Sequence, residues 1–218
     1  EPVTVQNSLV NFAMGSMPSA KPEARKTGRY LAIGGTIFAV VFLSIVVALI
    51  MFASVGIVPA VLATVVAFIP AMFYLLPFMW LDRYDPEPFW LLALAFAWGA
   101  LVSVIFSFFA NTIFGVGLAI ATSPETGESM SAVIAAPIFE EASKGSGLLI
   151  LLIFFRRYFD DILDGIVFAG VIALGFATVE NVLYYGRGLA GGGLVGLFIL
   201  IVLRGILSPF AHATFTSM

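Results

Sequence analysis

Long runs of apolar residues restrict the fold of this chain more than any other feature of its sequence. A helix crosses a bilayer with about 20 apolar residues, and several runs here reach or exceed that length. Backbone polar groups inside lipid must be hydrogen-bonded within their own segment, so the runs are predicted to be helices. The runs cover residues 31–55, 58–81, 89–120, 131–155, 162–185 and 194–218. The sequence therefore predicts an all-α, polytopic transmembrane helix bundle with six or more membrane segments.

The composition supports a membrane protein and excludes several other classes. Apolar residues make up 61% of the 218 positions, charged residues make up 11%, and the mean hydropathy is +1.09. A soluble domain carries charges at about a quarter of its positions, so a soluble fold does not fit. The net charge of −3 gives no reason to expect nucleic acid as a partner. Cysteine is absent, which excludes disulfides and thiolate metal sites.

Glycines and a proline mark the expected breaks and connections. The third run is longer than a bilayer requires and is expected to tilt or break near Gly115 and Gly117. Residues 186–193 are rich in glycine and are predicted to form a linker. After it, residues 194–203 are expected to lie in the interface or to re-enter the membrane. A new helix is expected to begin at Ser208, with serine as N-cap and a proline at the first helical position.

The N-terminal segment differs from the rest of the chain. Residues 1–29 mix prolines with a basic run and are predicted to be a flexible polar tail in the cytoplasm. Residues 30–218 are predicted to form one transmembrane domain. If the last helix begins at Ser208, about eleven of its residues are present, against the ~20 that span a bilayer. We therefore expect this domain, with at least one further span, to continue beyond Met218.

Positive charges predict the orientation of the chain. Lys and Arg precede the first run and occur again at Arg83 and at 156–157, whereas the connections 56–57 and 122–130 contain none. Cytoplasmic loops are enriched in these residues, so the N-terminus is assigned to the cytoplasm and residues 122–130 to the outside. Arg187 is the exception to this pattern.

Three of the apolar runs carry residues that can transfer protons. Ionised groups in the membrane core cost at least about 2.5 kcal/mol each, so they mark functional sites. At about 1.5 Å per residue, the first glutamate of the fourth run lies ~14 Å and that of the fifth run ~8 Å below the outer surface. A buried reaction site in the outer half of the membrane is therefore predicted. Its candidate residues are Glu140, Glu141, Lys144, Glu180, Asn181 and His212.

The spacing of these residues indicates a carboxylate base with a nearby cation. Lys144 is four residues from Glu140 and three from Glu141, so on a helix it can neutralise either carboxylate. Without a cation, two neighbouring carboxylates in a low dielectric would not both ionise, and a general base must be ionised. His212, with a reference pKa of about 6.5, shares a helix face with Thr216.

Each of these residues also has a purely structural interpretation. The glutamate–lysine cluster could be an internal ion pair that holds helices together. His212 could make an interhelical hydrogen bond. Asn111 and Arg204 are interpreted as helix-packing and interface residues.

Taken together, three segments resemble the motifs of the PrsW family of intramembrane proteases. Residues 136–145, Ala-Pro-Ile-Phe-Glu-Glu-Ala-Ser-Lys-Gly, contain its Glu-Glu-x-x-Lys motif. Residues 175–181, Gly-Phe-Ala-Thr-Val-Glu-Asn, are similar to its second motif, and residues 204–216 to its third. The Asp-Pro-Glu-Pro turn at 85–88 also resembles the family. The resemblance covers about residues 80–218, and its motif order is similar to that of the CAAX prenyl proteases.

The resemblance implies an intramembrane endopeptidase in a bacterial cytoplasmic membrane. Its substrate would be a membrane-anchored protein, similar to an anti-sigma factor, that is cut near the outer leaflet. Glu140 would hold the water and act as base, with Glu141 and Lys144 tuning it. Glu180 and Asn181 would orient the water or the histidine. The expected partners are this substrate and membrane lipids, and a larger membrane complex is left open. The last two site residues, which would stabilise the oxyanion, are His212 and Thr216.

Catalytic zinc favours three protein ligands rich in histidine, and this chain offers one histidine and no cysteine. We therefore expect a glutamate-activated water and no cofactor; the alternative is zinc held by Glu140, Glu180 and His212. Two other functions stay open. One is a catalytically silent family member that acts as an accessory subunit. The other is an ion-coupled transporter, which would more typically show inverted repeats with broken helices.

Overall fold

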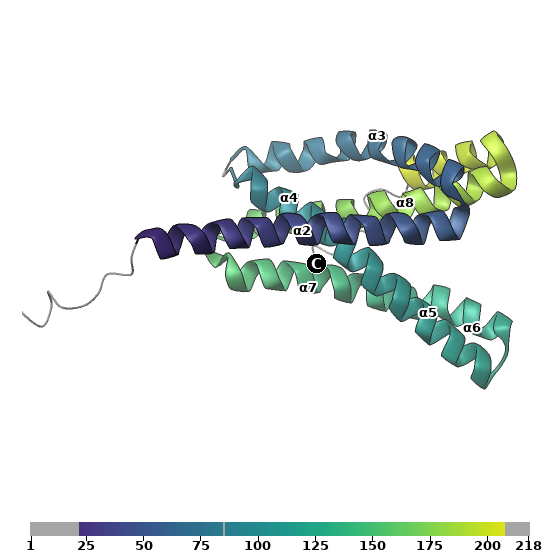
Figure 1. The fold of residues 1–218 in the computed structure, drawn as a ribbon. Coiled ribbons are helices and arrows are strands. Elements are labelled where there is room, and N and C mark those ends of the chain that lie inside the picture. The colour runs from purple at the N-terminus through teal and green to yellow at the C-terminus, as the bar shows by residue number, and fades with distance from the viewer. Residues whose placement is uncertain (1–21, 85, 208–218) are drawn as a thin grey trace, which may run out of the picture. The chain divides into compact units, whose positions relative to one another are not determined.

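The computed structural model describes residues 22–84 and 86–207, and this part of the chain is helical without a β-strand (Figure 1). The all-α prediction is therefore confirmed. The α-helices are α2 (Pro22–Val55), α3 (Ile57–Asp82), α4 (Phe89–Ala97), α5 (Val104–Ala121), α6 (Pro124–Met130), α7 (Ala136–Phe154) and α8 (Ile162–Leu200). Short π-helical stretches lie at Trp98–Ser103, Ser131–Ala135 and Ile201–Leu207, and a 3-10 turn lies at Arg156–Tyr158.

Within the described residues, four helical segments are long and apolar enough to cross a membrane, fewer than the six predicted. These segments are Thr27–Val55, Ile57–Asp82, Phe89–Ala121 and Ile162–Gly205. The run at 131–155 does form a helix, but three charged residues at its centre lower its hydropathy. The run that begins at 194 is not counted as a further span, because it belongs to the same helical segment, Ile162–Gly205, which changes direction at Gly193.

The chain reverses at one glycine inside α8. Gly193 has φ 59° and ψ −148°, values that a residue with a side chain rarely adopts, and the residues on either side of it are helical. The two arms of this hairpin touch, because a Cβ on Gly188 would lie 3.0 Å from the carbonyl oxygen of Gly196. Figure 1 shows the end of the described chain turning back in yellow beside α8. The predicted linker at 186–193 is therefore wrong for all but its last residue.

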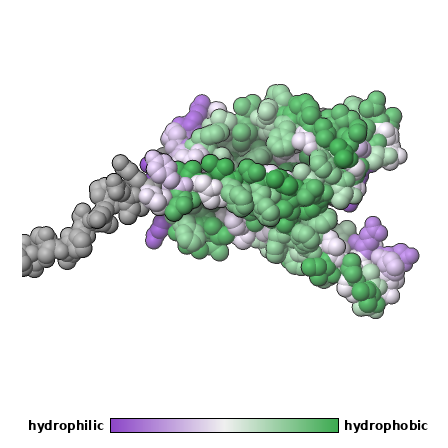
Figure 2. Space-filling model, in the orientation of Figure 1, coloured by the Kyte–Doolittle hydropathy of each residue, from purple (hydrophilic) through white to green (hydrophobic). Residues whose placement is uncertain are grey.

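Contacts divide the described chain into two units between Val41 and Phe42, and the candidate site lies in the second. In that unit α3, α4 and α7 pack on α8, and the core includes the fully buried Leu91, Phe168 and Ile172. Large apolar side chains also cover the outside of the helices, as expected where lipid is the solvent. Figure 2 shows hydrophobic residues along the helices and hydrophilic residues gathered around α6.

The third apolar run changes its helical geometry at a tight contact between helices. The expected break near Gly115 and Gly117 is wrong, because both residues lie in regular α5 and the π-helical stretch begins at Trp98. A Cβ on Gly99 would lie 1.9 Å from the carbonyl oxygen of Ile172, so this contact requires a glycine. The indole of Trp98 donates to the carbonyl oxygen of Ser143 at 3.0 Å. The glycine contact thus joins this stretch to α8, and the indole joins it to α7.

Replacing Gly99 with alanine should destabilise the bundle. The added methyl group would overlap backbone atoms of α8, and overpacking of this kind costs typically ~1–3 kcal/mol. Thermal unfolding in detergent should show a lower midpoint than for the unchanged protein. Gly117→Ala is the matched control, because nothing lies within 4 Å of a Cβ at that position. Equal midpoints for both variants would show that the Gly99 contact is not a tight one.

Candidate active site

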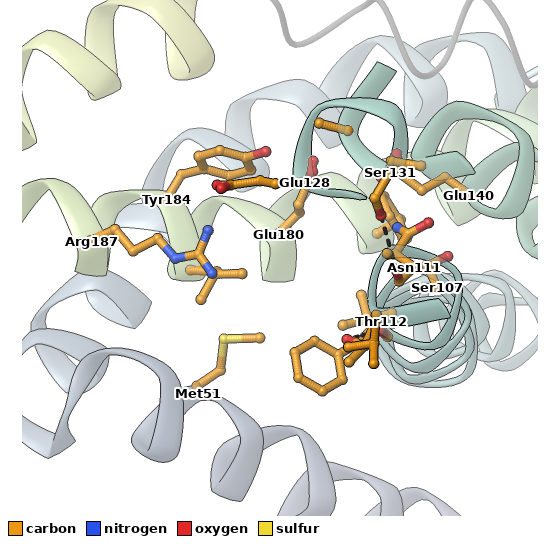
Figure 3. Close-up of a pocket in the computed structure, with 18 of the residues that line it drawn as sticks. Met51, Ser107, Asn111, Thr112, Glu128, Ser131, Glu140, Glu180, Tyr184 and Arg187 are labelled. Carbon is orange, nitrogen blue, oxygen red and sulfur yellow. Dashed lines mark hydrogen bonds between the residues drawn. The ribbon is translucent and has the colours of Figure 1, made fainter. Parts of the chain in front are cut away.

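A cavity of about 570 Å³ opens between α5, α6, α7 and α8. Figure 3 shows its polar side chains arriving from these helices and facing a common space. Two of the predicted site residues, Glu140 of α7 and Glu180 of α8, line it together. The other polar or charged residues in its wall are Ser107, Asn111, Thr112, Glu128, Ser131, Tyr184 and Arg187.

Serine contacts fix α7 against α5 beside the cavity. The hydroxyl of Ser107 lies 3.2 Å from that of Ser143, which also donates to the carbonyl oxygen of Glu140 at 2.9 Å. Asn111 and Glu140 each lie about one helical turn from this serine pair, in the direction of α6. The two residues therefore line the same part of the cavity.

Lys144 forms its ion pair with Glu141. The ammonium group is completely buried and lies 4.8 Å from the ring centroid of Phe176. Because α7 and α8 are antiparallel neighbours, this contact brings Glu140, one turn before Lys144, level with Glu180, one turn after Phe176. The sequence left open which glutamate the lysine would neutralise, and the structure shows an ion pair with Glu141, which does not line the cavity.

Arg204 organises the α8 side of the cavity, a role that the sequence interpretation missed. Its Nη2 atom donates to Glu180 Oε2 at 2.6 Å, and its Nε atom donates to Asn181 Oδ1 at 3.0 Å. The guanidinium carbon lies 3.6 Å from the ring centroid of Tyr184. The sequence contained one signal for this contact. Gly193 lies about midway between Asn181 and Arg204, so a reversal of the chain there brings the two residues together.

A second contact fixes the position of the return arm, the helical stretch from residue 194 to residue 207. The hydroxyl of Tyr74 on α3 donates to the carbonyl oxygen of Gly205, the residue after Arg204. The main chain beside Arg204 is thus tied to α3, while its guanidinium contacts α8 and is mostly buried, with 25% of the side chain exposed. The remaining predicted site residues, His212 and Thr216, lie outside the described residues.

A family model described as PrsW family intramembrane metalloprotease matches residues 87–218, which is more than half of the chain. The chain belongs to the PrsW family. The resemblance in the motifs is therefore confirmed, and the matched region includes every predicted site residue. With its apolar helices, the chain is a membrane protein.

Two curated PrsW proteins are similar to this chain. Protease PrsW of Geobacillus kaustophilus (strain HTA426) is 28% identical over 135 residues, which are 62% of this chain and 53% of the relative. Protease PrsW of Clostridioides difficile (strain 630) is 34% identical over 103 residues, which are 47% of this chain and 42% of the relative. The chain spans about half the length of these relatives. No solved structure matches it.

The name of the PrsW family model implies a metal, and the described residues alone do not supply a complete set of ligands for one. Among residues 22–84 and 86–207, no three His, Cys, Asp or Glu side chains are grouped closely enough to hold an ion. Glu180 is also bonded to the guanidinium of Arg204, and this positive charge would repel a second cation at the same carboxylate. The donor set inferred from the sequence also requires His212, which is outside the described residues.

Proposed function

We propose that this protein hydrolyses a peptide bond of a membrane-anchored protein by means of a water molecule activated by Glu140. The observation that carries the proposal is the position of Glu140, which lines the cavity beside polar groups of α5. Glu180 lines the cavity as well and is held by Arg204, and Glu141 does not line it. A base must reach the water that it activates, and Glu140 meets this requirement best.

In this mechanism Glu140 removes a proton from water while the water oxygen attacks the carbonyl carbon of the scissile peptide. The protonated Glu140 then gives its proton to the leaving nitrogen as the C–N bond breaks, which leaves a new carboxyl group and a new amine. Glu180 and Asn181, held by Arg204, would orient the water or His212. His212 and Thr216 would stabilise the oxyanion.

The buried pair of Glu141 and Lys144 has a supporting role in this proposal. The lysine brings a positive charge within one helical turn of Glu140 in a medium of low dielectric, where such a charge favours a neighbouring carboxylate in its ionised form. We propose a glutamic-type reaction without a cofactor because the chain has one histidine and no cysteine.

We further propose that the protein lies in a bacterial cytoplasmic membrane with its N-terminus in the cytoplasm, and that the cavity faces the outer leaflet. The support is the lysine and arginine pattern together with α6, which lines one end of the cavity and carries no positive charge. An impermeant thiol reagent should label a cysteine placed at Ser123 in intact cells. If that cysteine is not labelled, the proposed orientation is wrong and residues 122–130 face the cytoplasm.

The activity can be tested with the full-length protein in lipid vesicles and a panel of single-pass membrane proteins. Mass spectrometry of the products should find a cut within the outer half of the substrate's span or just outside it. Cleavage should persist after dialysis against a chelator if the reaction is of the glutamic type. Intact substrates combined with proton or cation uptake into the vesicles would overturn the proposal in favour of a transporter. Intact substrates without uptake would favour a silent accessory subunit.

A further inference from the structure

Asn111 lines the cavity and carries an unusual polar group. Its Oδ1 atom is buried and has no hydrogen-bond partner among the described residues. Buried polar atoms in folded proteins almost always have a partner, so each exception requires an explanation. In a membrane segment the requirement is stronger, because lipid offers no hydrogen bonds.

The serine and threonine hydroxyl groups near Asn111 have partners within the protein. Thr112 donates to the carbonyl oxygen of Phe108 at 2.7 Å, and Ser131 donates to the carbonyl oxygen of Asn111 at 2.9 Å. The Ser107 hydroxyl lies within hydrogen-bond distance of Ser143. The helices therefore supply partners for these hydroxyl groups and leave the side-chain oxygen of Asn111 without one among the described residues.

The cavity has the length needed for a short peptide segment. On α8 its lining runs from Phe176 to Arg187, which is ~16 Å along a helix at about 1.5 Å per residue. An extended peptide of about five residues covers this distance at about 3.3 Å per residue. The cavity is thus long enough to hold the residues on both sides of a scissile bond.

A membrane-anchored substrate must unwind to be cut in such a cavity. In a helix each interior carbonyl group is hydrogen-bonded to an amide four residues later and is shielded from an attacking water. Unwinding exposes main-chain N–H and C=O groups in a low dielectric, where each needs a new partner. A carboxamide can accept from an N–H group and donate to a carbonyl group, so it suits a peptide main chain of any sequence.

We propose that the carboxamide of Asn111 binds the main chain of an unwound substrate segment next to the bond that Glu140 hydrolyses. The Oδ1 atom accepts a hydrogen bond from one main-chain N–H group of this segment. This inference rests on the proposed protease function and adds to it the form in which the substrate is bound. It also gives Asn111 a role that the sequence interpretation, as a helix-packing residue, did not include.

The test uses the full-length protein and a synthetic transmembrane peptide substrate in vesicles. In a series of substrates, one main-chain amide at a time is replaced by an ester, which removes a single N–H group, and the scissile bond is left unchanged. For the unchanged protein, one position near the cut should lower kcat/KM about tenfold, as expected for the loss of one hydrogen bond. For Asn111→Leu, the all-amide substrate should already be slower by a similar factor, and the ester at that position should cause no further loss.

Ser103→Ala is the matched control for removing a buried polar group. The Ser103 hydroxyl is also buried without a partner among the described residues, and it does not line the cavity. This variant should show the same ester profile as the unchanged protein. Asn111→Ala provides a second test at the site if the leucine is too bulky.

The results distinguish this inference from the function on which it rests. If the ester effects in the Asn111 variants match those of the unchanged protein at every position, Asn111 does not bind the main chain, although the protease function stands. If the unchanged protein cuts no membrane-anchored substrate, both proposals fail.

Discussion

Replacing Glu140 with glutamine should abolish hydrolysis of a membrane-anchored substrate while the protein still folds. Glutamine keeps the size and hydrogen-bonding reach of the side chain but cannot accept the proton of the attacking water. General acid–base catalysis contributes ~10²- to 10⁴-fold, and here one group serves as base and then as acid, so a loss of at least 10³-fold is expected. Product formation in vesicles and thermal unfolding of the same preparation are the two measurements.

Glu128→Gln is a matched control for the loss of a carboxylate. Glu128 lines the same cavity from α6 but is exposed, and it lies about three turns before Glu140 in the chain. Its replacement should leave most of the activity. If the Glu140→Gln variant cleaves at the unchanged rate and the Glu180→Gln variant no longer cleaves, the base is Glu180 on α8. The mechanism would then need revision, although membership of the family would not.

Much of the fold could be predicted because a membrane imposes simple rules of length and composition. The apolar run at 58–81 corresponds to α3 at Ile57–Asp82. The run at 89–120 ends within one residue of the end of α5 at Ala121. The motif spacing likewise predicted that Lys144 would reach a glutamate on its own helix. These features depend on local sequence alone, since each helix satisfies its own backbone hydrogen bonds.

The features that could not be predicted depend on contacts between helices. Glycine weakens an isolated helix, so a glycine-rich stretch predicts a linker. Here the same glycines let the two arms of α8 approach closely at Gly188 and Gly196, and the chain stays helical until Gly193. The reversal then pairs Arg204 with Glu180 across more than twenty residues, a contact that local patterns do not specify.

The glutamate that pairs with Lys144 also could not be predicted from local sequence. Both lie within reach of the lysine on their own helix, and helical spacing alone does not distinguish them. In the structure the ammonium group forms an ion pair with Glu141 and lies against Phe176 of α8, a contact that depends on how the two helices pack.

Arg204→Met should have the second largest effect on activity. The guanidinium holds Glu180 and Asn181 at once, and its loss would leave a carboxylate without its ion-pair partner in a low dielectric. Misplacement of such groups by about 1 Å can lower rates by ~10²-fold, so kcat should fall by about that factor. Arg204→Lys keeps the charge but not the forked geometry and should restore only part of the rate.

Tyr74→Phe separates this effect from simple loosening of the return arm. It removes the hydrogen bond to the carbonyl oxygen of Gly205 but leaves the contacts of the guanidinium intact, so it should lower the unfolding temperature more than it lowers kcat. A double variant gives the decisive comparison. If Arg204 acts by holding Glu180, the double variant Arg204→Met, Glu180→Gln should lose little more kcat than the worse of the two single variants. The reason is that the effects of substitutions at coupled residues do not add. Fully additive losses would show that the arginine acts on some other part of the site.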